Sequence, residues 1–103
     1  MRLLATVLLS ALLAPIALPQ GKVIDEKAAV EFAEKALMRV YGKKKIKSER
    51  PFKAELKDGV WTVHGTLWCP DENGKLITSC VGGVATAKIS AMDGRVLSTF
   101  HTK

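Results

Sequence analysis

This 103-residue sequence contains two cysteines and two histidines, the residue types whose side chains most often react or bind metals. Cys69 and Cys80 lie on either side of an Asn73-Gly74 turn, where paired strands would bring them opposite each other. In an oxidising compartment such a pair forms a disulfide, and closing so short a loop stabilises a fold by about 3 kcal/mol at most. Two buried free thiols are the alternative. A redox-active pair is disfavoured because the CxxC spacing that tunes thiol reactivity is absent.

No catalytic or metal-binding set can be assembled from the remaining polar residues. His64 and His101 fall on different predicted strands, and once the cysteines are bonded to each other a four-ligand zinc site lacks ligands. The position of His64 within a strand is more typical of a surface or hydrogen-bonded histidine than of a general base. No Gly-rich phosphate loop and no nucleophile elbow occurs in the sequence. We therefore expect a protein that is not an enzyme, with no catalytic residues, no metal and no cofactor.

A basic segment at residues 43–50, predicted to be a loop, is the strongest candidate for binding a partner. The chain has a formal net charge of +6, which favours acidic partners. The segment either keeps a solvated connection soluble or forms an electrostatic patch for an acidic protein. Nucleic acid is disfavoured because no aromatic residues interleave with the lysines for base stacking. Trp68 and His64, which share one face of a predicted strand, complete the candidate partner-binding set: Lys43, Lys44, Lys45, Lys47, His64 and Trp68.

The first residues have the pattern of a secretory signal peptide. Arg2 gives a short positive region, residues 3–13 are apolar, and Pro15 ends the apolar run. A membrane anchor or a buried helix is the alternative, but a spanning helix needs about 20 apolar residues and this run is shorter. We expect residues 1–21 to be the signal peptide and residues 22–103 to be one domain. The protein is then periplasmic or secreted, and it contacts the membrane only through the signal segment.

Export predicts that the mature chain begins between Pro15 and Lys22. The physical reason is the end of the apolar run at Pro15, which is followed by small residues suited to cleavage, among them Ala17 and Gly21. N-terminal sequencing or the intact mass of exported protein measures this directly. Cytosolic material that retains Met1 would contradict the prediction.

The rest of the chain predicts an α+β fold with one helix followed by four strands. Asp25 is a plausible N-cap and Gly42 a plausible C-terminal residue of a helix whose apolar positions recur every three or four residues. Strands are predicted at residues 51–57, 60–69, 80–89 and 96–101, with turns at Asp58-Gly59 and at residues 93–94. The prediction is one N-terminal helix packed on a curved four-stranded antiparallel sheet.

Several short motifs in their order along the chain resemble the small immunity proteins with a nuclear-transport-factor-2-like fold. The motifs are Tyr41-Gly42, residues 51–56 (PFKAEL), residues 58–67 (DGVWTVHGTL), residues 82–85 (GGVA) and residues 93–97 (DGRVL). The resemblance covers about residues 26–101. It implies a cone-like domain from bacterial polymorphic toxin systems that binds and neutralises a cognate toxin without catalysis, and it supplies no catalytic residues.

Two other functions remain open from the sequence. One is a small envelope domain that binds a ligand or inhibits a peptidase, because folds of this size with a helix on a sheet also do so. The other is a degenerate enzyme of the same fold, which the absence of a paired Asp and His disfavours. The oligomeric state is left open by the sequence.

Overall fold

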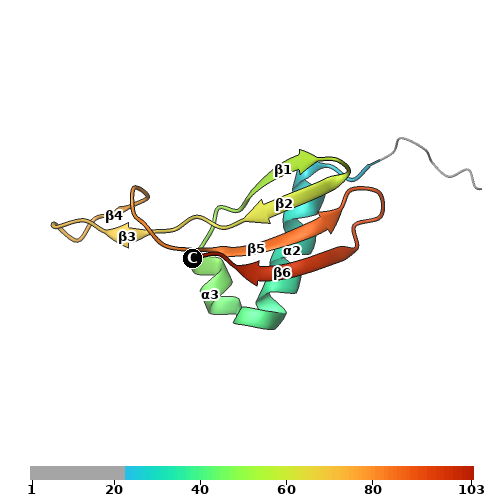
Figure 1. Ribbon diagram of the computed structural model, residues 1–103. Coiled ribbons are helices and arrows are strands. Elements are labelled where there is room, and N and C mark those ends of the chain that lie inside the picture. The colour runs from blue at the N-terminus through green and yellow to red at the C-terminus, as the bar shows by residue number, and fades with distance from the viewer. Residues whose placement is uncertain (1–22) are drawn as a thin grey trace, which may run out of the picture.

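The computed structural model describes residues 23–103, which form a helical layer packed on one face of an antiparallel sheet (Figure 1). This confirms the predicted α+β class. The predicted signal peptide lies outside the described residues. Within residues 23–103, no helix has both the length and the apolar composition that are needed to cross a membrane.

Helix α2 (Glu26–Tyr41) has both of the predicted ends. The Asp25 carboxylate accepts a hydrogen bond from the Ala28 N–H at 2.8 Å, so it caps the first turn. Gly42 ends the helix at φ 96°, a conformation that favours glycine, and its N–H donates to the Met38 carbonyl. The apolar stripe of α2 packs on the sheet through small residues and Leu37, and its fully buried members are Ala29, Ala33 and Leu37.

A second helix, α3 (Lys43–Ser48), replaces the loop predicted for residues 43–50. The prediction was wrong because a run of lysines with a single apolar residue, Ile46, lacks the apolar periodicity that indicates a helix. Lysine is a good helix former, and Ile46 is fully buried in the core. The Ile46 N–H donates to the Gly42 carbonyl at 3.2 Å, so the chain begins a new helix directly after the break at Gly42.

The main sheet has four antiparallel strands in the order β1-β2-β5-β6, as predicted. Their bounds are Lys53–Lys57, Val60–His64, Ala85–Ser90 and Val96–His101. Asp58 and Gly59 turn β1 into β2 with φ of 52° and 77°. Alternate residues of the strands face α2 and form the core with it; the fully buried ones are Val63, Ala85, Ala87 and Ile89.

The strands predicted at residues 60–69 and 80–89 are shorter in the structure. Strand β2 ends at His64 because the Thr66 N–H donates to the Glu49 carbonyl at 2.7 Å rather than to a neighbouring strand. Strand β5 begins at Ala85, after Gly82 turns the chain at φ 155°. The residues between these points, 67–82, form what we call the arm, which extends away from the main sheet (Figure 1).

The arm holds a second, two-stranded sheet made by β3 (Cys69–Pro70) and β4 (Leu76–Ile77). The prediction that the two cysteines lie directly opposite each other on paired strands is wrong, because Cys69 pairs with Ile77 across this sheet. Cys80 lies beyond β4, and it forms a disulfide with Cys69 at a Cα–Cα distance of 6.4 Å. The disulfide therefore closes the base of the arm.

The described chain begins at the opposite end of the sheet from the arm (Figure 1). The Ile24 N–H donates to the Ala91 carbonyl at 2.8 Å. The indole N–H of Trp61 donates to the Ile24 carbonyl at 3.1 Å. Both backbone groups of Ile24 are thus bound to the sheet, which fixes the chain just before α2 begins.

Candidate protein-binding site

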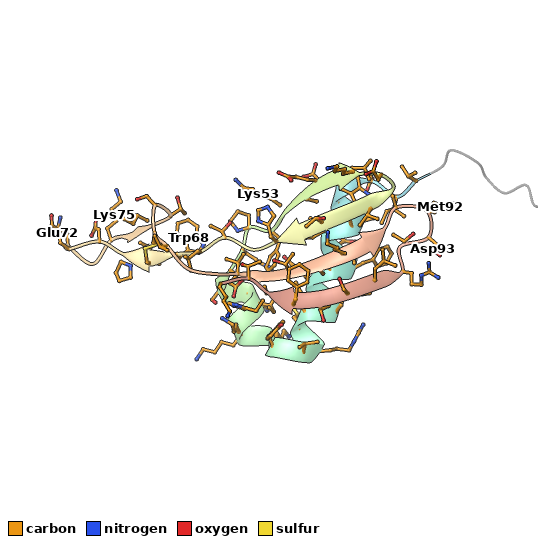
Figure 2. The ribbon with its side chains drawn as sticks, in the orientation of Figure 1. Lys53, Trp68, Glu72, Lys75, Met92 and Asp93 are labelled. Carbon is orange, nitrogen blue, oxygen red and sulfur yellow. A yellow bond between two sulfur atoms is a disulfide. The ribbon has the colours of Figure 1, made fainter. Side chains whose placement is uncertain are left out.

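Helix α3, the arm and the end of β6 enclose a hollow of about 310 Å³, which we call the α3–arm hollow. Its polar walls come mainly from α3, and its apolar walls come mainly from the arm. It is lined by Lys45, Ser48, Glu49, Thr66, Leu67, Trp68, Leu76, Gly83 and His101. In Figure 2, Trp68 lies at the base of the arm, whereas Glu72 and Lys75 lie toward its tip.

Glu49 joins three segments at the floor of this hollow. Its carboxylate accepts a hydrogen bond from the Ala85 N–H at 2.8 Å, and its other oxygen lies 3.1 Å from Lys45 Nζ. Its main-chain carbonyl accepts from Thr66. The Glu49 side chain is 8% exposed, whereas that of Lys45 is 49% exposed. The ion pair is therefore well solvated on the Lys45 side and contributes little to the stability of the fold. Loss of the buried hydrogen bond to β5 would leave the Ala85 N–H without an acceptor, which is costly.

Gly65 makes room for the Glu49 side chain. A Cβ placed on Gly65 would lie 2.6 Å from the nearer Glu49 carboxylate oxygen and 3.0 Å from the ring of Phe52. Only a residue without a side chain fits this approach. The buried position of the Glu49 carboxylate therefore requires a glycine at position 65, just after β2.

The four lysines of α3 are all exposed, although their surroundings differ. They are Lys43, Lys44, Lys45 and Lys47. Lys45 reaches across to Glu49 as described above. Within residues 23–103, no carboxylate lies in ion-pair distance of Lys43, Lys44 or Lys47. These three ammonium groups can therefore contact an acidic surface without breaking an ion pair within the described part of the chain.

Trp68 lines the same hollow as Lys45 and is partly covered. Its indole N–H donates to the Arg50 carbonyl at 2.8 Å, and its side chain remains 39% exposed. The Arg50 guanidinium in turn makes a two-pronged contact with Glu34 of α2, with its closest N–O distance at 2.7 Å. The hydrogen bond and the charge of Glu34 raise the pKa of Arg50 above its ordinary value. Trp68 is therefore held in place at its polar edge while one side of the ring faces solvent.

The two histidines lie on opposite faces of the sheet. His64 pairs with Thr86 on the open face, away from α2, whereas His101 pairs with the preceding residue of β5, Ala85, on the face toward α2. His101 lines the α3–arm hollow and packs edge-to-face on Tyr41 with ring centroids 5.9 Å apart. Of the candidate set, the structure brings Lys45 and Trp68 together at the hollow; His64 is not part of it.

Sequence reasoning did not find Glu49 or His101 as residues of this site. Glu49 sits in a run of lysines and resembles an ordinary surface charge, and His101 lies near the end of the chain. One signal was present, since a glycine inside a predicted strand commonly marks the close approach of another group. Gly65 is such a glycine, and Glu49 is the group that approaches it.

The geometry of the hollow suits recognition of a protein surface. Within residues 23–103, no three residues among the histidines, cysteines, aspartates and glutamates come together in a way that could hold a metal ion. The hollow instead combines a fixed aromatic side chain, the half-exposed ammonium group of Lys45 and a protruding arm. Rigid aromatic residues and exposed charges are the features that serve as anchors and as steering groups in protein interfaces.

One comparison with known proteins gives a match. A family model described as "NTF2 fold immunity protein" matches residues 28–103, which include most of α2 and all of α3, the main sheet and the arm. No curated protein sequence and no solved structure matches the chain.

Proposed function

The chain belongs to the NTF2 fold immunity protein family, and on that premise we propose that it binds and neutralises a protein toxin in the cell envelope, without catalysing a reaction. The observation that carries this proposal is the family match, which extends over nearly all of the described chain. Neutralisation then depends on surface complementarity, so the shape and charge of the binding surface decide which toxin is recognised.

We place the toxin at the α3–arm hollow. Lys45 lines it, and Lys43, Lys44 and Lys47 are exposed on the same short helix, which favours a toxin whose contacting face is acidic. Trp68 provides an aromatic anchor that is already fixed by its hydrogen bond to Arg50, so little side-chain freedom is lost on binding. The arm supplies additional apolar contact through Leu76, which is 59% exposed.

Two features support an envelope location. Residues 1–21 have the pattern of a signal peptide. Cys69 and Cys80 form a disulfide, and disulfides persist in oxidising compartments such as the periplasm rather than in the cytosol.

A growth assay tests the proposed function. The chain is expressed in the presence of a periplasmically directed toxin encoded by the neighbouring gene, with the full chain compared with a version that lacks residues 2–21. We expect the exported chain to restore growth and the cytosolic version not to. Absence of protection by the exported chain, together with no binding to the purified toxin, would contradict the proposal.

Replacing Lys43, Lys44 and Lys47 together with Gln is expected to slow association with the toxin by about tenfold or more at low salt. Exposed charges act over about 8–10 Å at physiological salt, so they raise the association rate more than they slow dissociation. Lys45 is left in place because its ammonium group lies against the buried Glu49. Surface plasmon resonance at low and at moderate salt measures the effect.

The matched control replaces Lys27, Lys57 and Lys88 with Gln. These exposed lysines lie outside α3 and the arm, and the change in net charge is the same. The control is expected to alter the association rate far less than the α3 variant. Equal rates for wild type and both variants would mean that the lysines only keep the domain soluble, and would direct attention to Trp68 and the open face of the sheet.

A further inference from the structure

Part of the α3–arm hollow is built from a segment that lies outside the core of the protein. Leu67, Trp68 and Leu76 line the hollow, and all three belong to the arm, residues 67–82. Within residues 23–103, none of the buried core residues comes from the arm. The helices and the main sheet can therefore stay packed whether or not the arm is in place, whereas the hollow is complete only when it is.

The two halves of the arm are attached to the main body in different ways. The half that leaves the main sheet is held by Trp68, whose indole N–H donates to the Arg50 carbonyl at 2.8 Å. On the half that returns, the first hydrogen bond to the main body in the described part of the chain joins the Val84 N–H to the Thr102 hydroxyl at 2.9 Å. Between these points, the hydrogen bonds described for residues 69–82 stay inside the arm. The returning half, which includes β4, therefore depends on the outgoing half for its position.

The Cys69–Cys80 disulfide is the covalent link between the two halves. Besides this bond, the halves are joined by the two residue pairs of the β3–β4 sheet, and an isolated two-stranded hairpin is marginally stable at best in water. Both cysteines are half-buried rather than enclosed in the core, which leaves the bond open to exchange with an external thiol. The state of the bond therefore determines whether the returning half is held against the hollow.

We propose that the Cys69–Cys80 disulfide is a redox switch for toxin binding, in which the oxidised chain has the complete α3–arm hollow and the reduced chain stays folded without it. The inference rests on the proposed function, because it concerns the surface to which we assign the toxin. In the reducing cytosol the chain is then a folded precursor that binds the toxin weakly. Oxidation in the cell envelope completes the binding surface.

The switching step is thiol–disulfide exchange with a disulfide-bonded oxidant protein. The thiolate of one cysteine attacks the disulfide of the oxidant and forms a mixed disulfide, and the other cysteine then displaces the oxidant. The bond between Cys69 and Cys80 forms while that of the oxidant breaks. Two electrons and two protons pass from the cysteines to the oxidant, which leaves as a dithiol. Dithiothreitol drives the reverse reaction and is itself oxidised to a cyclic disulfide.

Reduction is expected to weaken toxin binding rather than to abolish it. Trp68 keeps its hydrogen bond to Arg50, and the lysines of α3 stay exposed, so part of the surface remains. The apparent Kd rises in inverse proportion to the fraction of chains in the binding form, so an arm that is in place for one tenth of the time raises the Kd about tenfold. We expect a loss of this size or greater.

Surface plasmon resonance with the purified toxin of the neighbouring gene tests the switch. The exported chain is immobilised and measured oxidised, and again after dithiothreitol has been applied and washed out in oxygen-free buffer, so that the toxin never meets the reductant. The matched control replaces Cys69 and Cys80 with Ser; it should bind like the reduced chain and should not respond to dithiothreitol. Equal affinity of the oxidised and reduced chains would overturn the switch and leave the proposed function standing. Binding by neither form would contradict the proposed function itself.

Hydrogen exchange on wild type gives a second measurement that needs neither a variant nor the toxin. In the arm, the Asp71 N–H donates to the Lys75 carbonyl at 2.8 Å. Because hydrogen-bonded pairs alternate along an antiparallel ladder, Cys69 and Ile77 form the next hydrogen-bonded pair. We expect the amides of Cys69 and Ile77 to exchange faster after reduction, while the amide of the buried Val63 in the main sheet stays slow.

Two results of this exchange measurement would overturn the proposal. If the arm amides exchange at the same rate in both states, the arm stays in place without its disulfide and cannot act as a switch. If the amide of Val63 also becomes fast on reduction, the disulfide holds the whole fold together, and the reduced chain is not a folded precursor.

Discussion

The Glu49→Ala variant is expected to lose about 2–3 kcal/mol of unfolding free energy. The substitution removes the acceptor of the Ala85 N–H, and leaving one buried donor unsatisfied costs about 1–3 kcal/mol. It also empties the space that Gly65 leaves open for the carboxylate. Because Glu49 joins the end of α3 to the start of β5, the α3–arm hollow should lose its floor. Urea unfolding followed by circular dichroism measures the change.

Glu49→Gln is the matched control for this prediction. The amide oxygen of Gln can still accept from Ala85, and the side chain fills nearly the same space. Only the ion pair with the half-exposed Lys45 is lost, which contributes about 1 kcal/mol or less. If Glu49→Ala unfolds at the same urea concentration as wild type, the buried hydrogen bond does not hold these segments together.

Replacing Cys69 and Cys80 together with Ser is expected to release the arm at a cost of up to about 3 kcal/mol. The disulfide closes the base of the arm across a sequence separation of 11 residues. The two-stranded sheet of the arm contains only two residue pairs, and no residue of the arm belongs to the hydrophobic core. Without the bond, little else holds residues 67–82 in place. The main sheet is expected to stay folded, since its core is independent of the arm.

Limited proteolysis distinguishes release of the arm from global unfolding. In the double Ser variant, cleavage is expected first within residues 67–82, whereas the oxidised wild type should resist cleavage there. Wild type treated with a reductant serves as the control, and it should behave like the variant. If the arm of the variant resists protease, the hairpin is stable without its disulfide. If the variant and the oxidised wild type have the same unfolding midpoint, the disulfide contributes nothing to the stability of the fold.

Local signals in the sequence predicted the parts of the fold that depend on neighbouring residues. The cap at Asp25, the break at Gly42 and the Asp58-Gly59 turn each require a particular residue type at one position, so they could be read directly. These three points place α2 and the first hairpin correctly. The last hairpin, from β5 to β6, was predicted from the turn at Asp93-Gly94.

Long-range contacts decided what the sequence did not reveal. Helix α3 depends on the burial of Ile46 under α2 and the sheet, and a single isoleucine among lysines gives no periodic signal. The early end of β2 depends on the Thr66 N–H turning to Glu49, which lies 17 positions earlier in the chain. The candidate set was correspondingly only partly assembled: Lys45 and Trp68 meet at the hollow, whereas His64 occupies the open face.

The two ends of the described chain differ in a way that affects how the protein should be labelled or immobilised. His101 lines the α3–arm hollow, and a Cβ on Gly83 would collide with the Thr102 carbonyl, so the last residues pack directly against the base of the arm. A fluorophore, surface linker or fusion partner joined after Lys103 would stand at the mouth of the hollow and obstruct an incoming toxin. Attachment ahead of Ile24, whose backbone is bound to Ala91 and Trp61 at the opposite end, leaves that mouth open and keeps the added group away from it (Figure 1).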